Sequence, residues 1–308
     1  MMYLSHLLIN VGSDPDRPRP GRLWLRNVYR VHQRLAMAFP SASRLEADGD
    51  FLQPYAPEDF PEQRHIADQK PGEIDPDALR HVHTPRGADN GFLFRIDPLP
   101  SGRAVILVQS ALKPNWVYAF GLRPGLVDPR TNRPIGNAGH LLADFPSEPR
   151  HVHLTLEPGS RFRFRLVANP VRKVSRNSLD AQGRPVSEKW IGRHVPVPGD
   201  AEHLREWLER RAEPRWSAAR NSEDKQQPPG FRLIDLSSIQ TSYVYFNKNH
   251  DGATGQRLRS ARYEGVLEVT DCGHFRQTLA RGVGPGKAYG FGLLSLARAG
   301  GEEKSENH

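Results

Sequence analysis

Apolar and polar residues recur along the chain with the periods of strands and helices. Residues 1–10 are rich in Leu and Ile and run into the turn-rich stretch 12–21, which favours a short buried strand over a helix. Residues 23–39 carry apolar side chains at helical spacing, with arginines on the opposite arc, and Pro40 closes the segment. The chain is therefore expected to begin with a strand followed by a helix.

The middle of the chain returns to strand patterns. Residues 92–96 and 104–109 are apolar runs joined by DPLPSG, which predicts a β-hairpin. Residues 161–168, RFRFRLVA, alternate Arg with Phe or Leu. In a strand, this alternation places the arginines on one face and the apolar side chains on the other. We expect the apolar face to pack and the other face to present a row of guanidinium groups.

The last third of the chain repeats the same order of elements. Residues 200–212 predict a helix capped by Asp200, and residues 272–281 predict a shorter one. The strand patterns that lie between these helices are 231–239, 241–247 and 263–270. The order resembles two split βαββαβ units, so the sequence predicts an α+β fold of tandem ferredoxin-like (RRM-like) domains with long loop insertions.

Turn-rich segments set the expected domain division. Residues 41–90 and 113–158 are rich in Pro, Asp and Gly and show little periodicity, so both are expected to be long insertions. The end of the chain is polar, as disordered termini are. We expect an N-terminal domain over 1–175, a basic linker over 176–199, a C-terminal domain over 200–300 and a disordered tail over 301–308.

Composition narrows the class of partner. The 308 residues include 43 Lys and Arg against 35 Asp and Glu, which gives a formal net charge of +8 and favours a polyanionic partner. Cys272 is the one cysteine, which excludes an internal disulfide framework. No apolar run is long enough to span a bilayer and the N-terminus lacks a signal-peptide pattern, so we expect a cytoplasmic protein without a membrane partner.

Two residues of the first predicted helix are candidates for catalysis. Tyr29 and His32 stand three positions apart, so their side chains project from neighbouring points of one helix face. His32 falls within the apolar arc, which is compatible with a packed histidine satisfied by a hydrogen bond. It is also compatible with a cleft histidine that performs acid–base chemistry beside a phenol.

A basic block begins with the alternating strand. No acidic residue stands between positions 159 and 176. A charge run is usually a solvated face, but guanidinium groups opposite aromatic side chains fit a strand that lies along a phosphate backbone. The cations of this block are Arg161, Arg163, Arg165, Arg172, Lys173 and Arg176.

A glycine run follows the last predicted helix. It lacks the spacing of a Walker A loop and of a dinucleotide fingerprint. It would still present exposed backbone N–H groups beside a lysine, as a phosphate-binding loop does. One or two glycines would serve a tight turn, whereas this run has five in eleven positions. Its residues are Gly282, Gly284, Gly286, Lys287, Gly290 and Gly292.

Two histidine pairs are conceivable metal ligands. His81 with His83, and His151 with His153, would each share one face of a strand. Neither pair has a third ligand at a recognisable spacing. We therefore expect neither a metal site nor a cofactor.

Four stretches of the sequence resemble one known family. The run 281–294, RGVGPGKAYGFGLL, is similar to the glycine-rich signature of the RAMP superfamily of CRISPR-associated proteins, and within it to the CasE family. The opening MYLSHLLIN resembles the first strand of that family. NVYRVHQRL resembles its first helix, in which a Tyr and a His stand three apart, and FRFRLVANPVRK resembles its FRLxANPxxK segment.

The resemblance implies an activity. CasE proteins are repeat-RNA endoribonucleases of the type I-E system and subunits of its Cascade complex. The family cleaves the CRISPR repeat transcript at the base of its stem-loop without a metal, leaving a 2′,3′-cyclic phosphate and a 5′-hydroxyl. The family pattern gives His32 a proton transfer, as base or acid, and Tyr29 the positioning or polarisation of the reacting group.

The resemblance also implies RNA contacts and partners. We expect the repeat stem-loop and the other Cascade subunits as partners, with the two insertions contacting those subunits. A non-catalytic guide-RNA-binding RAMP subunit is the alternative, and a nucleotide-binding enzyme is a more remote one. The candidates for contacts with the stem backbone are Arg161, Arg163, Arg165 and Lys173. The other expected RNA-binding residues are Arg172 of the same basic block, Lys248, Arg257 and Arg259 in the hairpin 247–259, and Gly282, Gly284, Gly286 and Lys287 in the glycine run.

Overall fold

The structure, a computed structural model, forms two compact units that are considered separately. It describes residues 2–9, 20–39, 91–100, 103–120, 142–146, 148–178, 184–212, 228–247 and 255–298. Unit 1 consists of Met1–Leu154, Tyr245–Gln256 and Ala288–Gly290. Unit 2 consists of Thr155–Val244, Arg257–Lys287 and Phe291–His308. The predicted insertion 41–90 and tail 301–308 lie outside the described residues.

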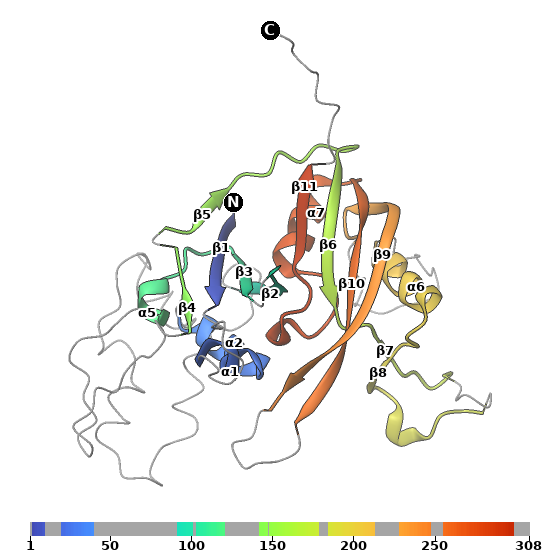
Figure 1. The fold of residues 1–308 in the computed structure, drawn as a ribbon. Helices are drawn as coiled ribbons and strands as arrows, with labels where there is room; N and C mark the ends of the chain where they lie inside the picture. The colour runs from blue at the N-terminus through green and yellow to red at the C-terminus, as the bar shows by residue number, and fades with distance from the viewer. Residues whose placement is uncertain are drawn as a thin grey trace, which may run out of the picture. The chain divides into compact units, whose positions relative to one another are not determined.

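Unit 1 is an antiparallel sheet built around its first strand (Figure 1). The sheet order is β2-β3-β1-β4, and β5 also pairs with β1. The strands are β1 Met2–Ile9, β2 Phe92–Pro98, β3 Ala104–Ser110, β4 Ala143–Asp144 and β5 Arg150–Val152, and the helices are α1 Pro20–Leu25, α2 Val28–Ala36 and α5 Trp116–Phe120. This is the strand–helix–strand–strand–helix–strand order of the ferredoxin-like fold.

The predicted helix over residues 23–39 is wrong in one respect, because the structure divides it into α1 and α2. Asn27 adopts an extended backbone, with φ −123° and ψ 93°, and caps α2 by accepting a hydrogen bond from the Tyr29 N–H. An Asn side chain competes for backbone donors better at a cap than inside a helix. Tyr29 and His32 both remain within α2, so their helical spacing is kept.

The predicted insertion over residues 113–158 is also corrected. It contains α5, β4 and β5, and its apolar residues contribute to the core of unit 1. Trp116 and Phe120 are buried, and the Trp116 indole N–H donates to the Ser5 hydroxyl on β1 at 2.8 Å. Turn-forming residues dominate the composition of this segment, but a few large apolar side chains decide where its described parts pack.

Unit 2 repeats the topology of unit 1. Its sheet order is β11-β6-β10-β9, again antiparallel where β6 meets β10 and β11. A two-stranded ribbon, β7–β8, follows the first strand. The elements are β6 Arg161–Ala168, β7 Val171–Lys173, η5 Glu188–Trp190, β8 His194–Pro196, α6 Ala201–Ala212, β9 Phe231–Phe246, β10 Gln256–Val269, α7 Cys272–Arg281, η6 Lys287–Tyr289 and β11 Leu294–Arg298. The tandem ferredoxin-like architecture is thereby confirmed.

The structure divides the chain earlier than the sequence pattern does. The strand β6 was expected inside a domain over 1–175, but it belongs to the unit 2 sheet, where it lies between β11 and β10. The expected linker over 176–199 contains η5 and β8 rather than a bare connection. Alternation identifies a strand, whereas its sheet is decided by partners about 100 residues away, which the local pattern does not contain.

The core of unit 2 lies on the apolar face of β6. Phe162, Phe164 and Leu166 are buried, as the alternation predicted. Tyr263 on β10 is also fully buried, and burial raises the pKa of its hydroxyl, which donates to the Leu204 carbonyl on α6. No helix in the described part of the chain is long and apolar enough to cross a membrane.

Candidate functional site

The candidate site of unit 1 is an aromatic cluster on α2 and β2. The His32 ring stacks on Phe92 with 5.3 Å between centroids and 23° between planes, and its centroid lies 6.2 Å from that of Phe94. Tyr29 lies one helical turn away, with 6.4 Å between its ring centroid and that of His32. The two candidate catalytic residues are therefore neighbours on one face of α2.

The environment of His32 distinguishes its two ring nitrogens. The residue is partly exposed, but its Nδ1 atom is buried. Nδ1 is therefore not the nitrogen that meets a bound molecule from solvent. The packed and the catalytic interpretations of His32 are compatible in this arrangement, because the ring stacks on Phe92 while the residue as a whole stays partly exposed.

Two further aromatic residues extend the cluster, and the sequence pattern did not single them out. The Tyr289 ring lies 6.2 Å from that of Tyr29 and 4.4 Å from that of Phe246. Tyr289 stands inside the glycine run, where the glycines drew attention away from the one large side chain beside them. Both residues belong to unit 1 although they lie more than 200 positions from α2.

A hydrogen-bonded pair holds the start of α2 to the end of β9. The Asn27 side-chain amide donates to the Asn247 carbonyl at 2.8 Å, and the Asn247 N–H donates to the Asn27 Oδ1 at 3.3 Å. Asn27 therefore caps α2 and also holds Asn247, which directly follows Phe246 in the chain. No local pattern marks this contact, because its partners are 220 residues apart.

The glycine run is explained by backbone geometry alone. All five of its glycines have positive φ, between 73° and 92°. At Gly290 a Cβ atom would lie 3.2 Å from the Phe94 ring, and at Gly284 it would lie 2.9 Å from Trp207. The argument that a turn needs only one or two glycines is therefore wrong here. An RNA-binding role for Gly282, Gly284 and Gly286 stays a prediction, and the Lys287 ammonium donates to the Gly284 carbonyl.

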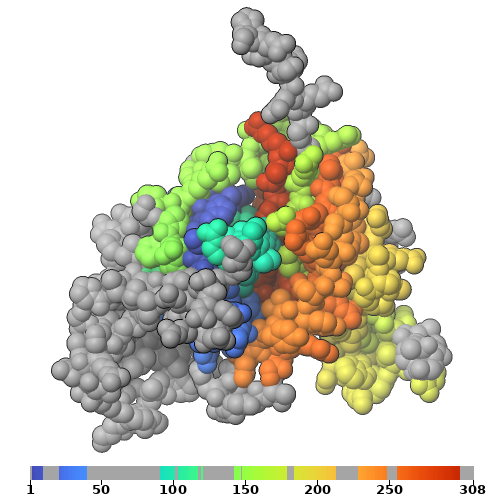
Figure 2. Space-filling view, in the orientation of Figure 1, coloured from blue at the N-terminus to red at the C-terminus, as the bar shows by residue number. Residues whose placement is uncertain are grey.

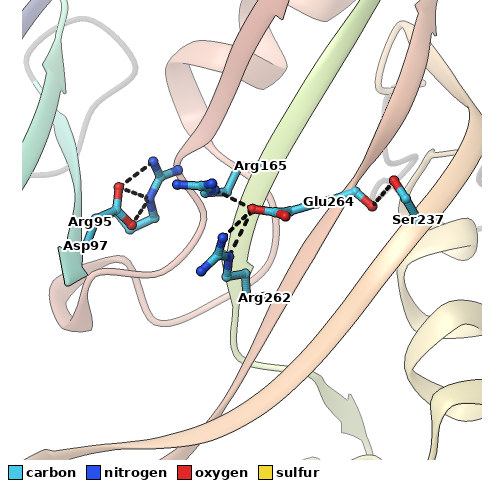
Figure 3. A network of polar contacts seen from close by, with 6 residues as sticks. All are labelled: Arg95, Asp97, Arg165, Ser237, Arg262 and Glu264. Atoms are coloured by element: carbon cyan, nitrogen blue, oxygen red, sulfur yellow. Dashed lines mark hydrogen bonds and ion pairs between the residues drawn. The ribbon is translucent and has the colours of Figure 1, made fainter. Parts of the chain in front are cut away.

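In unit 2, the arginine face of β6 is shared with acidic residues on β10. Arg165 and Arg262 both bind Glu264, at 2.6 Å and 2.5 Å (Figure 3). The Arg161–Glu268 and Arg232–Glu268 pairs are 2.9 Å and 2.7 Å long. The basic block contains no acidic residue in sequence, but pairing with β10 places Glu264 opposite Arg165 and Glu268 opposite Arg161.

These ion pairs keep both glutamates ionised. Hydrogen bonds from Arg262 and then Arg165 lower the pKa of Glu264, and hydrogen bonds from Arg161 and Arg232 lower that of Glu268. Each carboxylate is shared by two arginines, so the face keeps an excess of positive charge. Neutralisation is nevertheless greatest at Arg161 and Arg165, two of the three arginines that the alternation predicted to be available.

Arg163 differs from its neighbours on β6. Its cross-strand partners are Val266 on β10 and Ala297 on β11, whose side chains carry no hydrogen-bond acceptor. The residue is exposed. It makes no ion pair among the residues that the structure describes. Arg163 is therefore the arginine of this face best placed to meet an external anion.

The other predicted binding residues are distributed over unit 2. Arg172 and Lys173 are exposed on β7. The Arg257 guanidinium lies over the Tyr243 ring, 4.7 Å from its centroid, whereas Arg259 donates to the Val197 carbonyl and thereby has a structural role. Lys248 lies outside the described residues.

The histidine pairs form no recognisable metal site in the described part of the chain. The His151 and His153 rings are 4.5 Å apart. Among the residues of known placement, no three His, Cys, Asp or Glu side chains are grouped as metal ligands would be. His81 and His83 lie outside the described residues.

Two ferredoxin-like units, one with a Tyr–His pair on α2 and one with an arginine-lined sheet face, define a tandem ferredoxin-like protein. The chain belongs to a family of CRISPR-associated proteins, since the model of the family described as "CRISPR associated protein" matches residues 77–298. This agrees with the resemblance found in the four sequence stretches.

One curated relative matches nearly the whole chain, and another matches two thirds of it. The CRISPR system Cascade subunit CasE of Escherichia coli (strain K12) is 33% identical over 297 residues, which are 96% of this chain and 99% of the relative. The CRISPR-associated endoribonuclease Cse3 of Thermus thermophilus is 30% identical over 215 residues, 67% of this chain and 79% of the relative. A structure of CRISPR endoribonuclease Cse3 bound to 19-nt RNA has a TM-score of 0.56 at 26% identity, covering 96% of this chain and 99% of that one.

The Asn27 contacts generate a first prediction. Asn27→Ala removes the α2 cap and both contacts with Asn247, and should cost about 1 kcal/mol of unfolding free energy. Asn27→Asp is the matched control, because it keeps the acceptor for the Tyr29 and Asn247 N–H groups and loses only the amide donor. In urea unfolding, the midpoint concentration should be highest for the wild type, lower for the Asp variant and lowest for the Ala variant. An Ala variant that unfolds at the wild-type urea concentration would contradict the role given to Asn27.

Proposed function

We propose that the chain is a metal-independent endoribonuclease that cleaves CRISPR repeat transcripts at the base of their stem-loop. It then stays bound to the mature guide RNA as a Cascade subunit. The observation that carries this proposal is the pairing of Tyr29 and His32 on one face of α2. Because the His32 Nδ1 is buried, the proposal assigns proton transfer to Nε2. The relatives named Cse3 and CasE support the class of activity.

The proposed reaction uses the RNA's own nucleophile. The 2′-hydroxyl next to the scissile bond attacks the phosphorus, the bond from phosphorus to the 5′-oxygen breaks, and a 2′,3′-cyclic phosphate and a 5′-hydroxyl result. One proton leaves the 2′-oxygen and one reaches the departing 5′-oxygen. His32 performs one of these transfers through Nε2, and such a group contributes roughly 10²- to 10⁴-fold to the rate.

The aromatic cluster supplies positioning for this reaction. Stacking on Phe92 restricts the imidazole plane, so Nε2 has a fixed direction before RNA binds. Tyr29 stands beside His32 and can orient or polarise the reacting group through its hydroxyl. Because the nucleophile belongs to the RNA, the reaction needs no activated water, and a metal is not required to generate one.

Binding is assigned to the basic surface of unit 2. Its arginine face carries five arginines and two glutamates, and Arg163 is the cation without a carboxylate partner among the described residues. A-form RNA has a deep, narrow major groove, so phosphate contacts and shape are expected to dominate recognition of the stem. Such contacts make the affinity fall with salt.

A non-catalytic guide-RNA-binding subunit is the second candidate function. The observation that favours it is the packing of His32 against Phe92 and Phe94, which a purely structural histidine would also show. A binding subunit would not need the phenol and the imidazole side by side. The two candidates differ in one measurable property, which is cleavage of the repeat.

Cleavage of a repeat hairpin from the same genome in EDTA tests the proposal. The wild type should cleave, and His32→Ala should lose roughly 10²- to 10⁴-fold in single-turnover rate while keeping its RNA affinity. His151→Ala is the matched control, since His151 is an exposed histidine on β5 outside the aromatic cluster. It should cleave at the wild-type rate.

Other outcomes of this experiment select other mechanisms. A wild type that cleaves only with a divalent metal would replace the metal-independent reaction. Tight binding without cleavage under any condition would establish the guide-RNA-binding subunit and leave Tyr29 and His32 as packing residues.

The unpaired charge of Arg163 gives a separate prediction. Arg163→Ala should weaken binding of the repeat hairpin and reduce the salt slope of log K by about one, because one phosphate contact is lost. Arg276→Ala, which removes the same charge from an exposed position on α7, should change neither. Filter binding or fluorescence anisotropy between about 50 and 200 mM salt, the range over which such contacts respond, measures both. Equal slopes for Arg163→Ala and wild type would remove this strand from the interface.

A further inference from the structure

The described parts of the segment 171–197 of unit 2, residues 171–178 and 184–197, carry a set of exposed basic residues that the reaction at α2 does not use. The segment holds six Lys and Arg residues against Asp180 and Glu188, a net charge of +4 in a chain whose total is +8. Figure 2 shows the yellow-green atoms of this segment at the surface. Its cations are all exposed and are Arg172, Lys173, Arg176, Arg184, Lys189 and Arg193.

The base of this segment is firmly attached to unit 2. Val171, Val174 and Val197 are buried. The Trp207 indole N–H on α6 donates to the Val171 carbonyl at 3.0 Å, and the Arg259 guanidinium donates to the Val197 carbonyl. The ribbon β7–β8 therefore has a base that is held to unit 2 by buried side chains and hydrogen bonds.

The tip presents an aromatic ring to solvent. Trp190 is 43% exposed, whereas the other tryptophans that the structure describes are at most 8% exposed. The Arg193 guanidinium lies over its ring, 5.5 Å from the centroid. The Arg193 N–H donates to the Trp190 carbonyl at 3.1 Å, which holds the two residues in one short turn. An indole left in water costs free energy that a ligand can recover by covering it.

The cations around this ring are available to a ligand. Arg172, Lys173, Arg176, Lys189 and Arg193 make no ion pair within the described part of the chain. Glu188 is the one acidic residue described in the segment. A surface with this charge and one exposed indole has the two elements of a single-stranded nucleic-acid site, which are a basic track for phosphates and an aromatic platform for bases.

We propose that residues 171–178 and 184–197 bind single-stranded RNA next to the repeat stem-loop, with an unpaired base stacked on Trp190. Phosphates of the same strand would contact Arg193, Lys189 and the cations of β7. This inference rests on the proposed function, since it takes RNA as the ligand. A single strand is favoured over a duplex because the faces of paired bases are already stacked, so an indole can cover only an unpaired base.

Three RNAs test the inference: the repeat stem-loop alone, the same stem-loop with its single-stranded flanks, and an oligouridylate of about 12 nucleotides, which cannot pair. Trp190→Ala should weaken binding of the flanked RNA and of the oligouridylate roughly 5- to 100-fold, the effect of removing one base stack. Binding of the bare stem-loop should stay within about twofold of wild type. Trp190→Phe is the matched control and should keep most of the affinity, because it keeps an aromatic face.

Tryptophan fluorescence supplies a second readout. Oligouridylate should quench the wild-type emission, and Trp190→Phe should lose that quenching while the protein still binds. An equal effect of Trp190→Ala on all three RNAs, or no effect on any, would overturn the inference. Cleavage of the bare stem-loop is measured on the same variants and reports on α2 alone, so failure of the single-strand site and failure of the proposed nuclease are distinguishable.

Discussion

The backbone conformation of the glycine-rich run is the constraint on which the candidate site depends. Its five glycines have φ values that other L-residues rarely adopt. At Gly290 this conformation lets the chain approach Phe94 more closely than a side chain would allow. Because Gly290 directly follows Tyr289, the same turn sets Tyr289 beside Tyr29 and Phe246. Gly290 thus shapes the aromatic cluster through geometry, without any requirement that its amide bind a ligand.

Cross-strand register has a comparable influence on the charge of unit 2. The strand β6 is purely basic by sequence, but pairing with β10 brings Glu264 and Glu268 onto the arginine face. The carboxylates order four guanidinium groups and leave Arg163 opposite Val266. Electrostatic attraction for a polyanion is therefore concentrated at fewer residues than the alternation indicates, and the exposed ribbon β7–β8 adds a second basic region.

Local patterns predicted most of the elements, because strands and helices are set by residues close in sequence. The helix 272–281 was predicted with the bounds it has, and the strand at 161–168 with the correct buried face. Partners distant in sequence were not predictable. The hydrogen bonds of Asn27 with Asn247 join residues 220 positions apart, and the sheet that contains β6 depends on β10 and β11. Tyr29 and His32 could be predicted as a pair because they stand three residues apart on one helix. The contact of Tyr289 with Tyr29 joins residues 260 positions apart, so only the fold shows it.

The central claim is that the RNA supplies its own nucleophile to a site held in place by α2. The most direct measurement is cleavage, in EDTA, of a repeat hairpin that carries a single 2′-deoxy nucleotide immediately 5′ of the scissile phosphate. The account predicts that this RNA binds as tightly as the unmodified hairpin and is not cleaved at that bond. Cleavage of the 2′-deoxy RNA at the normal position would show that water or another group attacks the phosphorus, and would contradict the roles given to Tyr29 and His32.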